Sequence, residues 1–206
     1  MQKMTFDRFY TQNRTKQTLM EDYISISQLN DFIFCPYSIY LHSVYMEADE
    51  DRYHATPQVR GRQSHESVDR KSDAHRHILQ SLPVYSESLG LMGKIDQFDT
   101  SSQRLIERKY ELKQLFRGQQ YQLWAQYLCM LEMGYLVSEI AFYEISTRRM
   151  MLQPLPTILE IVELTDFIER FRGFDPNTKI TINPNKCRHC IYCNLCHNTD
   201  VENVYE

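Results

Sequence analysis

The stretch GKIDQFDTSSQRLIERKYEL, residues 93–112, indicates the fold around which this chain is organised. Two segments in which polar and apolar residues alternate flank the turn-forming run DTSS, and this pattern predicts a β-hairpin. Side chains alternate between the two faces of a strand, so Glu107 and Lys109 are expected to share one face. The turn is expected to bring Asp96, on the preceding strand, beside Glu107.

This hairpin also carries a candidate catalytic set. An aspartate and a glutamate that converge can bind a hard divalent cation, and a nearby lysine makes the set suited to phosphodiester hydrolysis. Lys109 would orient a water molecule or offset developing charge. His65, on a polar segment upstream, is a candidate further ligand that would favour manganese over magnesium. The alternative is a surface Glu–Lys pair, which is common and contributes little.

The rest of the chain predicts a mixture of helices and strands. Residues 25–46 predict two short helices, with Ser27 as the first N-cap and Cys35 at the joint. A polar loop is expected over 47–58, and a mostly polar helix over 58–80. Further strands are expected over 83–87, 136–146 and 148–155, and helices over 117–133 and 156–173.

Length and composition narrow the class of protein. A chain of 206 residues with 42% hydrophobic and 24% charged residues predicts one packed domain, or a domain with a small appended module. The net charge of −4 means that nucleic-acid binding would have to rest on a local patch. No apolar run approaches the roughly 18 residues of a spanning helix, and the N-terminal residues lack the pattern of a signal peptide, so a cytoplasmic protein without a membrane segment is expected.

Four of the six cysteines crowd into KCRHCIYCNLC, residues 186–196. A structural zinc site usually has two cysteine pairs separated by roughly 12–20 residues, whereas here the second pair follows after two. Closely spaced cysteines are typical of iron–sulfur loops that a remote cysteine completes. Cys35 is the natural remote partner, with zinc as the alternative metal. Cys129 lies within an apolar helix pattern and is expected in the core.

The order of these motifs resembles the CRISPR-associated Cas-four nucleases, which are similar to the nuclease domains of RecB-type helicase-nucleases. The resemblance spans residues 25–197. Its motifs in order are FCP with Cys35, RGRQSHE with His65, GKIDQF with Asp96, ERK with Glu107 and Lys109, QLWAQ with Gln122, and the terminal cysteines.

The resemblance implies an α/β fold: a restriction-endonuclease-like, PD-(D/E)xK core with a mixed central sheet flanked by helices, plus a cysteine-ligated iron–sulfur module that joins the N- and C-terminal segments. The chain would divide into an N-terminal arm (1–24), helices with the first cluster cysteine (25–46), the nuclease core (47–180) and the C-terminal cluster segment (181–206).

The resemblance also implies the site residues. Mn²⁺ or Mg²⁺ would be held by the residues His65, Asp96 and Glu107 and the main-chain carbonyl of Arg108, with Lys109 and Gln122 completing the catalytic set. A [4Fe–4S] cluster would be held by Cys35, Cys187, Cys190 and Cys196. Cys193 departs from the family pattern as an extra thiol, which either replaces a neighbour as ligand or takes no part in binding the cluster. Gln126 stands where the family often has a tyrosine, with Tyr127 one place later, and the roles of both stay open.

The function implied is that of a metal-dependent DNA exonuclease with single-strand preference, which processes prespacer ends in CRISPR adaptation beside the Cas-one and Cas-two integrase proteins. The alternative is a non-catalytic iron–sulfur or zinc protein that binds nucleic acid or acts as a scaffold in an integrase complex.

Overall fold

The computed structural model of this chain describes residues 23–45 and 77–199. Its strands are β1 (Ile24–Ser25), β2 (Ile78–Gln80), β3 (Pro83–Ser86), β4 (Leu91–Lys94), β5 (Gln97–Asp99), β6 (Arg104–Lys109), β7 (Glu139–Glu144) and β8 (Arg149–Gln153). Its helices are α2 (Ile26–Phe34), α3 (Pro36–Tyr45), α5 (Arg117–Glu132), α6 (Ile158–Arg172) and the short α7 (Pro184–Cys187), followed by a 3₁₀ turn, η3 (Cys193–Leu195).

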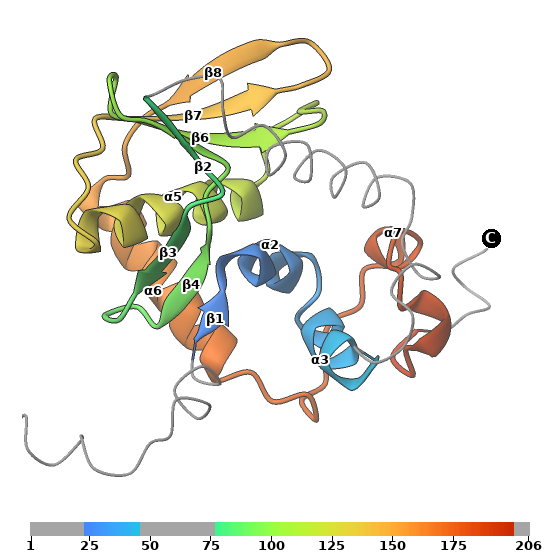
Figure 1. The fold of residues 1–206 in the computed structure, drawn as a ribbon. Coiled ribbons are helices and arrows are strands. Elements are labelled where there is room, and N and C mark those ends of the chain that lie inside the picture. The colour runs from blue at the N-terminus through green and yellow to red at the C-terminus, as the bar shows by residue number, and fades with distance from the viewer. Residues whose placement is uncertain (1–22, 46–76, 200–206) are drawn as a thin grey trace, which may run out of the picture.

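The strands form two mixed sheets, which helices flank (Figure 1). In the five-stranded sheet, of order β2-β5-β6-β7-β8, only β6 and β7 are parallel. In the three-stranded sheet, β4 lies between β1, which is parallel to it, and β3, which is antiparallel. The expectation of an α/β protein with a mixed sheet flanked by helices is therefore confirmed.

One long hairpin belongs to both sheets. Its first arm consists of β2 and β3, and its second arm consists of β4 and β5. Gln80 lies opposite Gln97 in the five-stranded sheet, and Pro83 lies opposite Lys94 in the three-stranded sheet. The register is the same on both sides, so no residue is inserted where the hairpin passes from one sheet to the other.

The hairpin bends between the sheets, and Asp96 lies at the bend. Two main-chain hydrogen bonds continue the pairing there, from Ser81 N to Asp96 O (3.2 Å) and from Ile95 N to Leu82 O (3.0 Å). Ser81 has a φ of 51°, in the left-handed region that a residue with a side chain rarely adopts. Asp96 is thus held at a fixed turn of the backbone.

Helices α2 and α5 pack closely because α5 has a glycine, Gly118, at the point where it meets α2. A Cβ atom on Gly118 would lie 2.3 Å from Asn30 Oδ1 and 3.0 Å from Asn30 Cα. Only a residue without a side chain allows this approach. The main core lies between the sheets and helices α2, α5 and α6, with Leu29, Leu105 and Ile168 fully buried.

Several sequence-based expectations about these elements are confirmed. Two helices flank Cys35, which is the C-cap of α2. Strands β7 and β8 pair across the turn that contains Thr147. Helix α6 follows Thr157, whose Oγ1 accepts a hydrogen bond from Glu160 N at 3.3 Å, and ends before Gly173.

Other expectations were wrong. Residues 78–80, expected at the end of a helix, form strand β2, because they pair with β5. The N-cap of α2 is Ser25 rather than Ser27, since Gln28 Oε1 accepts a hydrogen bond from Ser25 N. The stretch GKIDQF is divided by the bend into β4 and β5. Ile24, expected in the N-terminal arm, is buried in β1.

Candidate functional site

The centre of the candidate site is the carboxylate of Glu107, which is fully buried on β6. As the alternation of the strand predicts, Lys109 lies on the same face, with its Nζ atom 2.8 Å from Glu107 Oε1. A buried charge is costly unless it is paired and hydrogen-bonded. The chain meets this requirement with donors from Lys109 and from helix α5.

Gln122 links the lysine to the glutamate. Its Nε2 atom donates to Glu107 Oε1 at 2.7 Å, and its Oε1 atom accepts from Lys109 Nζ at 3.0 Å. Because the nitrogen of the Gln122 amide contacts the glutamate and its oxygen contacts the lysine, the amide fixes the position of Lys109 relative to the Glu107 carboxylate. The Lys109 side chain is 21% exposed, so a partly exposed lysine lies beside a buried anion.

Gln126 lies one helical turn beyond Gln122 and completes the contacts to Glu107. Its Nε2 atom donates to Glu107 Oε2 at 2.8 Å and to the carbonyl oxygen of Lys94 at 3.3 Å. Gln126 is 1% exposed, and its Oε1 atom is buried without a hydrogen-bond partner in the described part of the chain. The two glutamines therefore hold the two carboxylate oxygens of Glu107 from one face of α5.

Asp96 is buried at the hairpin bend and contacts the main chain of β6. Its Oδ2 atom accepts a hydrogen bond from Arg108 N at 2.7 Å. The N–H and C=O groups of one residue in a strand point toward the same neighbouring strand. The Arg108 carbonyl therefore faces the side on which Asp96 lies, while Lys109 O faces β7 and accepts from Ile145 N at 2.9 Å.

The structure thus brings together five of the six residues expected at the metal and catalytic site. They are Asp96, Glu107, Arg108, Lys109 and Gln122. His65, the sixth, lies outside the described residues. Among the described residues, no three His, Cys, Asp or Glu side chains are arranged to hold a single metal ion.

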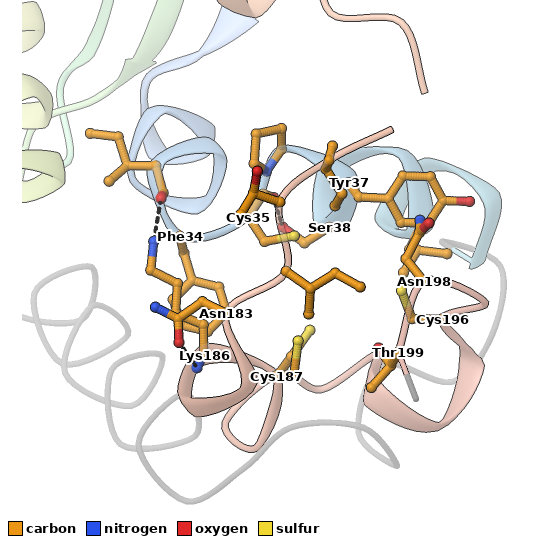
Figure 2. A pocket seen from close by; sticks show the side chains of 17 residues that line it. Phe34, Cys35, Tyr37, Ser38, Asn183, Lys186, Cys187, Cys196, Asn198 and Thr199 are labelled. Atoms are coloured by element: carbon orange, nitrogen blue, oxygen red, sulfur yellow. Dashed lines mark hydrogen bonds between the residues drawn. The ribbon is translucent and has the colours of Figure 1, made fainter. Parts of the chain in front are cut away.

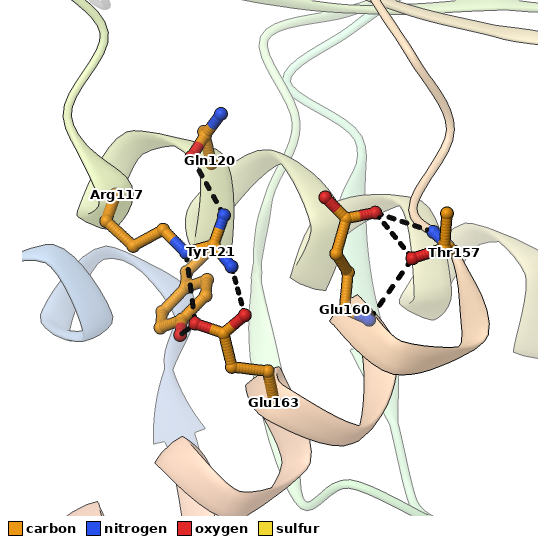
Figure 3. Close-up of polar contacts among 6 residues, drawn as sticks. All are labelled: Arg117, Gln120, Tyr121, Thr157, Glu160 and Glu163. Atoms are coloured by element: carbon orange, nitrogen blue, oxygen red, sulfur yellow. Dashed lines mark hydrogen bonds and ion pairs between the residues drawn. The ribbon is translucent and has the colours of Figure 1, made fainter.

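Helix α5, which presents both glutamines, is anchored to α6 through one polar cluster (Figure 3). Arg117 forms an ion pair with Glu163, and Tyr121 OH donates to Glu163 Oε1 at 2.5 Å. These hydrogen bonds lower the pKa of Glu163 below its ordinary value. The guanidinium of Arg117 also lies over the Trp124 ring, 4.8 Å from its centroid.

Four cysteines line a second feature, a cavity of about 140 Å³ between α3 and the C-terminal segment (Figure 2). They are Cys35, Cys187, Cys190 and Cys196. By the same measure a single water molecule needs only about 10–15 Å³, so the cavity is more than a packing defect. Most of its remaining wall comes from residues 33–41 and 180–186, which are far apart in the sequence.

The two other cysteines lie elsewhere. Cys193 is buried and does not line the cavity, and Cys129 is fully buried in the core as expected. Burial raises the pKa of Cys129 to about 12 and that of Cys190 to about 11. Burial likewise raises the pKa of Cys187. Without a ligand these thiols are protonated at neutral pH, so a metal group would have to displace their protons.

Contacts that involve no cysteine also join the two walls of the cavity. Tyr37 OH lies 3.0 Å from His197 Nδ1, and His42 Nδ1 lies 2.6 Å from Tyr192 OH. In Figure 2 the Lys186 ammonium reaches across to α2, where Nζ donates to the carbonyl oxygen of residue 33 at 2.9 Å. The segment with the terminal cysteines is therefore docked on α2 and α3.

Sequence reasoning left the role of Gln126 open, although a usable signal was present. Gln122 and Gln126 are four residues apart, so they share one face of a helix. The pattern could not show that both side chains reach the same carboxylate, because that depends on how α5 crosses β6. The side chain of Tyr127, by contrast, packs against the core.

Comparison with known proteins gives a fold but no family. No family model and no curated protein sequence matches this chain. Among solved structures, the chain is similar to the crystal structure of SSO0001, with a TM-score of 0.59 over 92% of this chain and 90% of that one. The two sequences are 14% identical, and a likeness at this level concerns the fold alone. In the described part of the chain, no helix is both long and apolar enough to cross a membrane.

Proposed function

We propose that this protein is a metal-dependent deoxyribonuclease whose centre is the Glu107 carboxylate. The proposal rests on the contacts of this buried carboxylate. Lys109 forms an ion pair with it, and Gln122 and Gln126 donate hydrogen bonds to it, so that it is held in one orientation. When a buried ion pair is replaced as a whole by apolar residues of similar volume, the change is often neutral or stabilising, so a gain in stability alone does not account for this pair. A buried carboxylate held beside a partly exposed lysine supports a role in binding and chemistry.

The residues proposed to hold a divalent cation would offer it oxygen atoms. Asp96 and Glu107 supply carboxylate oxygens, and the Arg108 carbonyl faces the side of Asp96. Mg²⁺ and Mn²⁺ prefer such oxygen ligands, and the expected imidazole of His65 would favour Mn²⁺. When bound, the ion would polarise a phosphodiester and lower the pKa of a water molecule.

Lys109 is the residue that would act on the substrate. Its ammonium is held 2.8 Å from Glu107 and 3.0 Å from Gln122, so it has little freedom to move away. A fixed positive charge next to a scissile phosphate stabilises the negative charge that develops during hydrolysis. It can also donate a hydrogen bond to the attacking water molecule. Gln122 would keep the lysine in place.

We further propose that the cysteine cavity holds a [4Fe–4S] cluster. The four cysteines that line it, Cys35, Cys187, Cys190 and Cys196, are those implied by the resemblance, and Cys193 is not among them. In a cluster each thiolate binds a different iron atom, so the sulfur atoms surround a volume. In a zinc site all four converge on one ion at about 2.3 Å. The four cysteines that line one cavity support the proposal, with zinc as the alternative.

The biological role proposed for this activity rests on the resemblance to the Cas-four nucleases. On that basis the PD-(D/E)xK core would act as an exonuclease with single-strand preference. It would trim prespacer ends in CRISPR adaptation in contact with the Cas-one and Cas-two proteins. The mixed sheet and its flanking helices are compatible with such a core.

Lys109→Ala tests the enzymatic proposal, with Lys113→Ala as the matched control. Lys113 is 81% exposed and belongs to the loop after β6, so its removal takes away a nearby charge without touching Glu107. We expect Lys109→Ala to reduce Mn²⁺-dependent degradation of single-stranded DNA by at least about 100-fold, in the range of contributions from positioned catalytic groups. Lys113→Ala should retain activity.

The result that would overturn this proposal is equal cleavage by the Lys109→Ala and wild-type proteins. It would favour the non-catalytic alternative, in which the protein binds nucleic acid or acts as a scaffold. DNA binding, measured by fluorescence anisotropy in EDTA, shows whether a loss of cleavage reflects lost chemistry or lost substrate.

A further inference from the structure

Gln126 has an unsatisfied acceptor at the centre of the molecule. Its Oε1 atom is buried without a hydrogen-bond partner among the described residues, although the side chain is held at its other end. A buried polar atom that lacks a partner is destabilising and is rare in folded proteins. Residues 23–45 and 77–199 therefore contain no group that satisfies this oxygen.

The orientation of the amide is set by its neighbours. Exchanging the nitrogen and oxygen atoms of Gln126 would bring the oxygen against Glu107 Oε2 and the Lys94 carbonyl, both of which are acceptors. The nitrogen must face them, because only it can donate. The unsatisfied atom is thus an acceptor, and it requires a cation or a donor.

The neighbouring ammonium does not fill this requirement, since Lys109 Nζ is directed to Glu107 Oε1 and Gln122 Oε1. The two oxygen atoms of the Glu107 carboxylate also differ in the number of hydrogen bonds that they accept. Its Oε1 atom accepts from Lys109 and Gln122, whereas within the described ranges Oε2 accepts only from Gln126. A carboxylate oxygen offers about two lone-pair directions. Oε2 therefore has acceptor capacity left, next to the amide with the unsatisfied oxygen.

We propose that Gln126 is a ligand of the metal centre and that its Oε1 atom supplies a neutral oxygen to the divalent cation beside Glu107 Oε2. Side-chain amide oxygens are ordinary ligands for hard cations. The inference rests on the proposed function, because it takes a cation at this place as given. It gives Gln126 two tasks, since its nitrogen orients Glu107 and its oxygen binds the ion.

Two substitutions separate these tasks. Gln126→Met keeps the length of the side chain but removes both the donor and the oxygen ligand. Gln126→Glu loses the donor, retains an oxygen and adds a charge. Gln120→Met, on the same helix, removes an amide that contacts Arg117 instead of Glu107 and is the matched control. Circular dichroism establishes that each full-length variant folds.

The measurement is Mn²⁺ affinity, from titrations followed by electron paramagnetic resonance of free Mn²⁺, together with Tm in EDTA and in Mn²⁺. Gln126→Met should weaken Mn²⁺ binding by about 10-fold or more, as when groups that support a metal site are removed. Gln126→Glu should bind Mn²⁺ at least as tightly as the wild type. Its Tm should be low in EDTA, because two carboxylates then face each other, and should rise with Mn²⁺ more than that of the wild type.

Three outcomes would overturn the inference. If Gln126→Met binds Mn²⁺ as the wild type does, Gln126 is not a ligand, and the proposed nuclease function is untouched. If both variants bind equally weakly, the amide only orients Glu107. If the wild-type protein binds no Mn²⁺ and cleaves no DNA with it, the proposed function fails as well.

Discussion

At the scale of single residues, the site depends on carboxylates whose hydrogen bonds are supplied by nearby groups. Glu107 shows this in the core, and Asp99, the last residue of β5, shows the same principle outside the site, where the turn to β6 begins. Asp99 Oδ1 accepts from Ser101 N and Ser101 Oγ, and Oδ2 accepts from Ser102 Oγ. These hydrogen bonds, led by the Ser101 hydroxyl, lower the pKa of Asp99 to about 2. The turn they stabilise joins β5 to β6.

This lowered pKa predicts how Asp99→Asn changes stability with pH. The unfolded-state pKa of an aspartate is about 3.9, so the ionised carboxylate stabilises the fold above that pH, and its contribution is lost as the pH falls toward 2. Asp99→Asn should therefore lower the Tm at pH 7, with a gap to the wild type that narrows below pH 4. Thermal denaturation from pH 3 to 7 measures the gap. A gap that stays constant over this range would contradict the assignment.

At the scale of elements, the close packing of α2 against α5 positions both glutamines. Gly118→Ala should disturb it, because the new Cβ would lie 3.0 Å from the Asn30 main chain, which cannot move aside as a side chain can. Overpacking costs about 1–3 kcal/mol. The higher helix propensity of alanine offsets about 1 kcal/mol of this.

Urea denaturation measures the net loss of stability. Gly173→Ala is the control, since its new Cβ would meet only Glu169 O at an ordinary 3.4 Å. We expect Gly118→Ala to unfold at lower urea concentration than the wild type and Gly173→Ala to unfold close to it. Equal midpoints for the two variants would show that α2 and α5 can separate without cost.

The elements also show why the sequence predicted part of the site. Alternation along β6 placed Glu107 and Lys109 on one face, because the period of a strand is a local property. The bend at Asp96 could not be predicted, since alternation continues through it and the unusual backbone belongs to Ser81, on the other arm. Strand β2 was missed for a similar reason. Its three residues are extended because β5 pairs with them.

At the scale of the whole molecule, the cysteine cavity joins segments about 150 residues apart. If it holds an iron–sulfur cluster, Cys35→Ser should lose iron and sulfide, while Cys193→Ser, whose thiol is outside the cavity, should keep both. Analysis of anaerobically purified protein, with its visible absorption, measures this. Iron loss in Cys193→Ser with retention in Cys35→Ser would assign the cluster to the four local cysteines. Zinc in colourless wild-type protein would exclude the cluster.

The distance in sequence between the two walls of the cavity also governs the order in which the molecule is assembled during synthesis. Cys35 leaves the ribosome about 150 residues before Cys187. By then the sheets and α2, α5 and α6 are free to fold. Whatever the cavity encloses can thus be surrounded only after residues 180–199 have been made, because these residues form the wall opposite Cys35.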